Sequence, residues 1–151
     1  MKILLASDGT RYGEAAAEML DKLNLGDGDE VKIISVIDMQ VPLAIDIYGG
    51  YLPDTSELEK ASRENAVKVV EGTTEKLRRI FGDKNVAISS ETLFGSPESR
   101  IVETAEEMHA DLIVIGSHGY GTWERLLIGS VSNSVVHHAP CSVLIVRIPK
   151  E

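Results

Sequence analysis

The sequence has little cysteine and no long apolar run, and each shortage excludes a class of protein. Its 151 residues include one cysteine, Cys141. A single thiol excludes an intrachain disulfide framework and a cysteine-rich zinc site. The longest apolar stretches, ILLA at 3–6 and LIVI at 112–115, are far shorter than a membrane span. Met1 and Lys2 lead directly into a strand-like run with no signal-peptide cleavage site. We therefore expect one soluble, cytoplasmic domain over residues 1–151.

Basic residues are also scarce relative to acidic ones. The chain has 15 Lys and Arg against 24 Asp and Glu, a net charge of −9. Nucleic acids and anionic membranes attract proteins through fields of Lys and Arg. The acidic balance therefore argues against nucleic-acid and membrane partners. An anionic ligand would have to be held by local dipoles, or bind together with a cation.

What the sequence does contain is a regular alternation of strand-like and helix-like segments. Short apolar runs predict strands at 2–7, 31–37, 85–93, 111–116 and 142–147. Apolar residues at helical spacing predict helices at 10–25, 56–81, 97–108 and 130–138. Strands joined by helices run parallel, with helices on both faces of the sheet. The pattern predicts a doubly wound five-stranded α/β sheet, Rossmann-like, in the order 3-2-1-4-5.

Several local signals predict where these elements begin and end. Ser56 to Glu59 have the form of a capping box, and Gly26 and Gly82 follow helices. Ser96 and Pro97 are a strong helix start. Weak alternation favours an edge position for the strand at 85–93. Residues 38–54, rich in Pro, Gly and Tyr, interrupt the rhythm as a long loop of the functional or variable kind.

The predicted topology and the glycine pattern point to the same crevice. Ligands of doubly wound sheets bind beyond the carboxyl ends of the strands, where the strand order reverses. Here that point lies between residues 6–8 and residues 115–117. A glycine cluster begins there, with Gly116, Gly119 and Gly129 followed by Ser130. Glycines give a ligand close access to backbone amides and allow positive φ, and the last helix presents its first amides and the Ser130 and Ser132 hydroxyls. This combination predicts an anion site suited to a polyphosphate.

At these residues the chain resembles the universal stress protein family, in its ATP-binding branch. That branch carries G-x2-G-x9-G-(S/T), matched by Gly116, Gly119, Gly129 and Ser130. The resemblance extends over nearly the whole chain and implies an adenine nucleotide alpha hydrolase-like fold. It implies ATP binding, with Val36 against the base. The acidic balance of the chain favours Mg²⁺ as a companion of the phosphates, with Asp8 as a candidate ligand. The nucleotide site that the resemblance implies comprises Ala6, Ser7, Asp8, Val36, Ile115, Gly116, Gly119, Gly129, Ser130, Val131 and Ser132.

The same resemblance implies an assembly and a role. Family members commonly dimerise through the last strand, here Val143, Leu144, Ile145 and Val146, and an edge strand this apolar would otherwise favour aggregation. A homodimeric, nucleotide-dependent signalling or stress-response switch is the function expected. No catalytic residue is assigned, because the motif holds no obvious base and no cationic clamp for a γ-phosphate. A slow Mg-dependent ATPase and a non-nucleotide protein-interaction module are the alternatives.

Other signals in the sequence are weaker. Asp8 precedes a helix and suits its N-cap as well as it suits a ligand. A phosphatase of the haloacid-dehalogenase type would need an aspartate where Ala6 stands, and a Walker loop would need a lysine where Thr122 stands. His118 is expected as an exposed loop residue within reach of a phosphate. His137 and His138 lack companions at the spacing of metal ligands.

Overall fold

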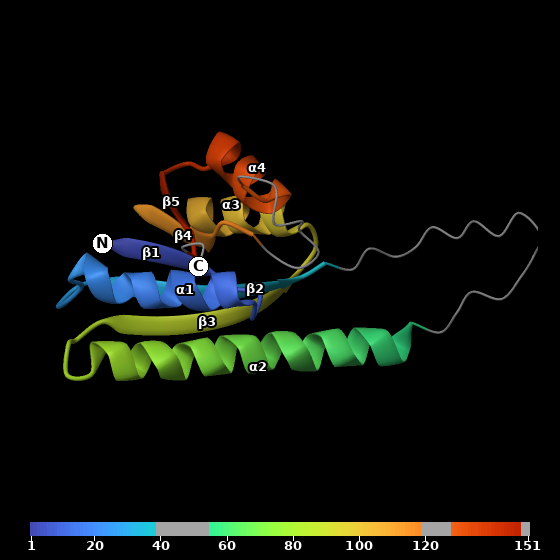
Figure 1. Cartoon of the computed structure of the whole chain (residues 1–151), viewed down its shortest axis with the longest axis horizontal. Helices are drawn as coiled ribbons and strands as arrows, with labels where there is room; N and C mark the ends of the chain where they lie inside the picture. Colours follow the sequence, from blue (N-terminus) through green and yellow to red (C-terminus); the bar gives the residue numbers. More distant parts are fainter. Residues whose placement is uncertain (39–54, 119–127, 149–151) are drawn as a thin grey trace, which may run out of the picture.

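The computed structural model describes residues 1–38, 55–118 and 128–148 (Figure 1). Strands and helices alternate along the chain, with one short 3₁₀ helix, η1. Their bounds are β1 Lys2–Ala6, α1 Arg11–Met19, η1 Leu20–Leu23, β2 Glu30–Ile37, α2 Ser56–Phe81, β3 Ala87–Phe94, α3 Pro97–Glu107, β4 Leu112–Gly116, α4 Ser130–His138 and β5 Ser142–Val146. The predicted loop at 38–54 lies outside the described residues from residue 39 on.

All five strands are parallel and form one sheet in the order β3-β2-β1-β4-β5. The predicted fold and strand order are therefore confirmed. β1 pairs with β2 on one side and β4 on the other, so the strand order reverses at β1 and β4. The edge position expected for β3 is also correct, and β5 forms the opposite edge.

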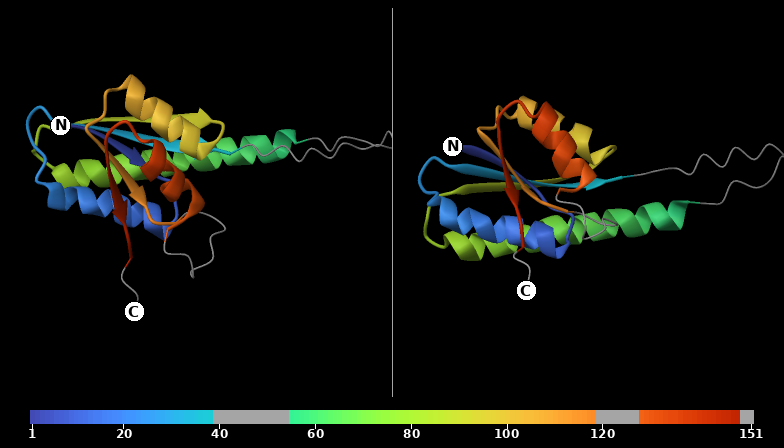
Figure 2. Two further views of the ribbon diagram at one scale, coloured as in Figure 1. Left: turned by 90° about the horizontal axis from the view of Figure 1, so that it is seen from above. Right: turned by 45° about the horizontal axis from the view of Figure 1, so that its top comes forward.

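Helices cover both faces of the sheet (Figures 1 and 2). α1 and α2 lie on one face, where Ala17 and Leu77 pack on Leu5 and Ile33. α3 and α4 lie on the other, where Ile101 and Val135 join the core. The central strands are apolar on both sides because both of their faces are buried.

The end of one helix and the cap of another differ from the prediction. The first helix tightens into η1 and stops at Asn24, whose left-handed φ of 53° ends it before Gly26. The bounds predicted for the second helix are correct, but the capping box is wrong, because Thr55 and not Ser56 is the N-cap of α2. Leu58 then occupies the third helical position, where a capping box requires Glu or Gln. The helix starts at Pro97 and Ser130 are confirmed.

Nothing in the described segments has the length and hydropathy of a membrane-crossing helix.

Candidate functional site

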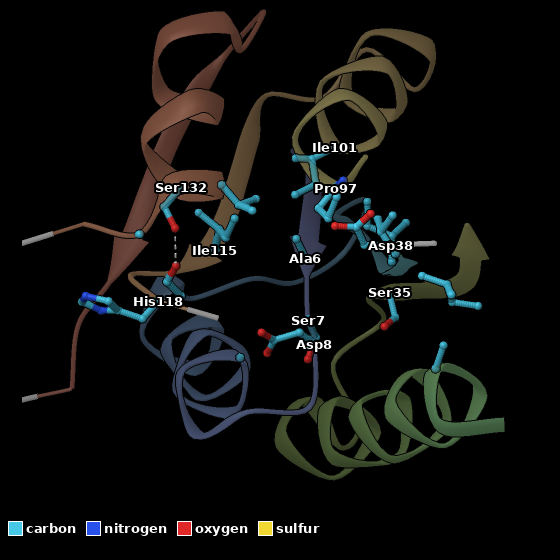
Figure 3. A pocket seen from close by; sticks show the side chains of 18 of the residues that line it. Ala6, Ser7, Asp8, Ser35, Asp38, Pro97, Ile101, Ile115, His118 and Ser132 are labelled. Carbon is cyan, nitrogen blue, oxygen red and sulfur yellow. Dashed lines mark hydrogen bonds between the residues drawn. The ribbon is translucent and has the colours of Figure 1, made fainter. Parts of the chain in front are cut away.

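A pocket of about 460 Å³ opens at the carboxyl ends of β1, β2 and β4 (Figure 3). The start of α1, the N-terminal half of α2, and the first turns of α3 and α4 complete its walls. It therefore lies at the reversal of strand order, where doubly wound sheets bind ligands. Its volume is in the range of pockets that hold small molecules and cofactors, about 300–1,000 Å³.

The structure brings the predicted site residues together around this pocket. Every one of them that the structure describes contributes to its lining: Ala6, Ser7, Asp8, Val36, Ile115, Gly116, Gly129, Ser130, Val131 and Ser132. Gly119 lies outside the described residues, as do Trp123 and Arg125 of the same loop. This convergence is geometric, and the role of these residues in holding a nucleotide remains a prediction.

Gly116 is a glycine for a different reason from the one expected. It does not adopt a positive φ, as the expectation allowed. A β-carbon at this position would lie 2.7 Å from the carbonyl oxygen of Tyr12. Real β-carbons do not approach other atoms this closely, so the glycine allows α1 to pack against the end of β4. The missing side chain of Gly116 thus serves the fold beside the pocket.

The N-terminus of α4 faces the pocket. Gly129 is its N-cap, with φ −69° and ψ 162°, an extended conformation open to any residue. The Gly129 N–H donates to the Ser117 carbonyl at 2.7 Å, which fixes the helix start to the end of β4. Because the first amides of a helix have no intrahelical partner, the turn at residues 130–132 presents a positive dipole end to the pocket.

The two serines of this turn have different surroundings. The Ser132 hydroxyl is buried and donates to the Gly116 carbonyl at 2.8 Å, as drawn in Figure 3. Its proton is therefore used within the protein, which corrects the expectation that it is a hydroxyl donor to a ligand. Ser130 is exposed at the pocket rim. The donors of this turn that are left for a ligand are thus its backbone amides and the Ser130 hydroxyl.

Asp8 supports the N-cap of α1, and Thr10 is the N-cap itself. The Gly13 N–H donates to Thr10 Oγ1 at 3.5 Å. Thr10 in turn donates to Asp8 Oδ1 twice, from Oγ1 at 2.6 Å and from its N–H at 3.0 Å. The carboxylate is held in one orientation, and it lines the pocket. Its second oxygen, Oδ2, accepts no hydrogen bond within the described ranges.

His118 also contributes to the lining, and it is half-buried rather than an exposed loop residue. Its Nδ1 lies 3.0 Å from Ser117 Oγ. Its ring centroid is 5.1 Å from that of Tyr12, at an interplanar angle of 45°. With Asp8 and Asp38 it supplies the ionisable side chains among the described lining residues, where Lys and Arg are absent.

Apart from Val36, the sequence did not predict the part of the lining that β2, α2 and α3 supply. The additional lining residues include Ser35 and Asp38 from β2 and its end, Ser62 and Asn65 from α2, and Pro97 and Ile101 from α3. Two of them left a signal in the sequence. Ser35 is a polar residue inside a β-branched strand, and Asn65 is a polar residue within the apolar stripe of α2.

The described part of the chain contains one thiol, that of Cys141, and no cluster of metal-ligating side chains. No group of three His, Cys, Asp or Glu side chains there could hold a metal ion. His138 Nδ1 lies 2.8 Å from the Ser134 carbonyl at the exposed end of α4. Cys141 is half-buried, and burial raises the pKa of its thiol.

Comparison with known sequences identifies relatives along nearly the whole chain. The model of the universal stress protein family matches residues 1–147. A universal stress protein of Methanocaldococcus jannaschii is 34% identical over 150 residues, which cover 99% of this chain and 84% of the relative. A putative universal stress protein of Staphylococcus aureus is 36% identical over 146 residues, or 96% of this chain and 82% of the relative.

Solved structures share the fold. The hypothetical protein MJ0577 superposes with a TM-score of 0.71 at 25% identity, over 99% of this chain and 97% of its own. A family protein of Arabidopsis thaliana with AMP bound gives 0.68 at 20% identity, over 99% and 92%. A universal stress protein in complex with cAMP gives 0.63 at 20% identity, over 97% and 96%. The family match over residues 1–147 and relatives above 30% identity together show that this chain belongs to the universal stress protein family.

Proposed function

We propose that the protein binds ATP in the pocket at the carboxyl ends of β1, β2 and β4. The observation that supports this proposal is that an apolar wall and a helix N-terminus line the same cavity. Ile101 and Ile115 supply apolar surface, and the first turn of α4 supplies free amides. A nucleotide has a matching division between a flat, mostly apolar base and an anionic tail. The AMP and cAMP complexes in the family support an adenine nucleotide as the ligand class.

The parts of the nucleotide have distinct places in this proposal. The base packs against Val36 and Ala6, near the ends of β2 and β1. The phosphates bind the amides of residues 130–132, where the helix dipole favours anions. Asp8, already oriented by Thr10, accepts a hydrogen bond from the ribose through its second carboxylate oxygen.

Magnesium fits the same arrangement as a companion of the phosphates. The described lining residues include two aspartates and no Lys or Arg, so the charge of a triphosphate is left without a cationic side chain. Mg²⁺ is usually bound through one or two carboxylates together with substrate phosphates. Asp8 is the carboxylate that would hold it here, and the ion would supply the missing positive charge.

The proposed role is that of a cytoplasmic, nucleotide-dependent switch in signalling or stress response. Two copies pair along β5, whose edge is apolar, to form the active homodimer. Nucleotide occupancy at the start of α4 then acts on the neighbouring β5 and so on the dimer. The protein is a binding protein rather than a dedicated enzyme, because the described pocket lacks a cationic clamp for a leaving phosphate.

The direct test is to identify the nucleotide that copurifies after gentle isolation and acid release. ATP or another adenine nucleotide is the expected product. Added Mg-ATP should also raise the melting temperature, because a ligand that binds the native state stabilises it. Nucleotide-free protein whose melting temperature ATP does not change would overturn the proposal.

A further inference from the structure

Two serine hydroxyls that line the pocket have no hydrogen-bond partner among the described residues. Ser7 and Ser35 are 6% and 4% exposed, and both line the pocket. Across residues 1–38, 55–118 and 128–148, neither hydroxyl takes part in a hydrogen bond. Since no fully enclosed side-chain polar atom in these ranges lacks a partner, both hydroxyls are open to the pocket. Burying a hydroxyl without a hydrogen bond is costly, so their partner must come from the cavity.

The two serines lie side by side on the α1 and α2 face of the sheet. Ala6 is in register with Ile34, and both pack on the opposite face, in the core beneath α3 and α4. Side chains alternate along a strand, so the next residues, Ser7 and Ser35, point toward α1 and α2. Figure 3 shows the Ser35 side chain directed toward α2. A β-carbon on Gly13 of α1 would lie 2.9 Å from Ser7 Oγ, which places that hydroxyl close beneath α1.

Helix α2 extends this polar corner of the pocket. Ser62 and Asn65 line the pocket from the helix, and we call the four neutral polar lining residues Ser7, Ser35, Ser62 and Asn65 the serine lobe. The serine lobe contains hydroxyls and an amide and no charged group. The charged lining residues nearest to it in sequence, Asp8 and Asp38, are acidic. Phosphate is therefore disfavoured here, whereas the start of α4, on the other face of the sheet, favours it.

We propose that the serine lobe receives the polar edge of the nucleobase and that Ser35 is a specificity-determining contact. The inference rests on the proposed nucleotide binding and extends it to the choice of base. An adenine edge presents an exocyclic amine beside ring nitrogens, so it both donates and accepts hydrogen bonds. A serine hydroxyl can do the same. A base without the amine can still accept from the hydroxyl through a ring nitrogen but cannot donate to it, so it loses one hydrogen bond that adenine makes.

The test compares Ser35→Ala with the wild type for binding of three probes: ATP, GTP and purine riboside triphosphate, which lacks the 6-amino group. Ser35→Ala should weaken ATP binding about 3- to 10-fold, the value of one hydrogen bond. The affinity for purine riboside triphosphate should change less. The ratio of the ATP affinity to the affinity for this analogue should therefore be smaller in Ser35→Ala than in the wild type. The melting temperature without ligand should not fall, because the lost hydroxyl has no partner among the residues that the structure describes. Ser89→Ala, on the exposed β3 strand, is the matched control and should leave all affinities unchanged.

The outcomes separate this inference from the proposed function. If wild type binds ATP and Ser35→Ala leaves the preference among the three probes unchanged, the serine lobe does not read the base and nucleotide binding stands. An equal loss of affinity for all three nucleotides would also contradict a role of Ser35 in base selection, because it would indicate a general change in the pocket. Wild type that binds none of the probes overturns both proposals.

Discussion

Gly116 at the end of β4 lies in direct contact with the backbone of Tyr12 in α1. The space that a side chain at Gly116 would occupy is filled by the Tyr12 carbonyl group. A glycine that the resemblance assigns to the nucleotide site therefore also joins the first helix to the central sheet. The contact makes the stability of the fold depend on a residue that the sequence motif assigns to the ligand.

Gly116→Ala should destabilise the protein by about 1–3 kcal/mol, the usual cost of forcing extra atoms into a packed site. Urea unfolding monitored by circular dichroism gives this value. Gly72→Ala is the matched control, because Gly72 is an exposed helical glycine with nothing within 4 Å of its β-carbon position. That change should stabilise α2 by about 0.5–1 kcal/mol. Equal effects at the two glycines would show that the Tyr12 contact is unimportant.

Thr10→Val should lower stability by about 1 kcal/mol and weaken ATP binding at the same time. The substitution preserves shape and removes the hydroxyl that caps α1 and donates to Asp8. Calorimetry should show the affinity loss, and thermal unfolding the loss of the cap. Thr10→Ser keeps the hydroxyl and should restore both. If Thr10→Val lowered stability but left the ATP affinity unchanged, the hydrogen bond from Thr10 to Asp8 would not matter for ATP binding.

Gly129→Asp should abolish most ATP binding. The extended backbone of Gly129 suits a residue other than glycine, and aspartate is a good N-cap. Because Gly129 is buried, the melting temperature of each variant is measured beside its affinity. A carboxylate at the start of α4 would repel the phosphates and occupy their amides. Gly129→Asn has the same shape without the charge and should bind ATP more than about tenfold better than Gly129→Asp. Equal ATP affinities in the two variants would contradict the proposal that the phosphates bind at the start of α4.

Gly119→Val tests the motif glycine in the same loop. The resemblance predicts that this substitution abolishes ATP binding and that the fold, measured by circular dichroism, is retained. Unchanged affinity would count against this part of the site.

The ion pair at the amino end of the sheet predicts how stability depends on pH. Asp29 Oδ1 accepts from the Met1 ammonium at 2.6 Å, and Oδ2 accepts from the Gly26 N–H at 2.9 Å. These hydrogen bonds, first that with the ammonium and then that with Gly26, lower the pKa of Asp29 below its ordinary value of 3.8. The bond with Asp29 likewise raises the pKa of the Met1 ammonium above 8.0.

The signs of these shifts give a stability plateau. A lowered carboxyl pKa stabilises the native state above pH 3.8, and this contribution is lost as the pH falls through the native pKa. A raised ammonium pKa stabilises it below pH 8.0, and this contribution is lost as the pH rises through the native value. Urea unfolding across this range should show Asp29→Asn losing stability mainly on the plateau. Asp27→Asn, in the same turn but exposed, should follow the wild-type profile.

The proposed dimer is tested by sedimentation. Wild type should sediment as two copies, and Val143→Lys in β5 should shift the equilibrium toward one copy, because a charge opposes pairing at an edge strand. Ser90→Lys, on the β3 edge, should leave the dimer intact. Melting temperatures of both variants distinguish dissociation from unfolding. A monomeric wild type at high protein concentration would contradict the assembly.

The fold was predictable because apolar periodicity encodes it directly. Runs such as residues 3–6 and 112–115 are apolar on both faces, as strands buried on both faces of a parallel sheet require. The site was predictable where topology dictates it, at the ends of β1 and β4. The wall supplied by Ser62 and Asn65 was not, because α2 reaches the pocket through packing between segments distant in sequence. The Gly116 contact with Tyr12 was hidden for the same reason.

The two edges of the sheet differ in a way that limits growth of an assembly. β3 presents Ser89, Ser90 and Glu91 along an exposed, polar edge, whereas β5 is apolar except for Ser142. In the proposed dimer the β5 edges of two copies pair with each other. Both outer edges of the paired sheets are then the polar β3 strands, so no further copy can pair through β5. Such a chain is expected to form a closed pair and to resist the open-ended strand addition that leads to fibres.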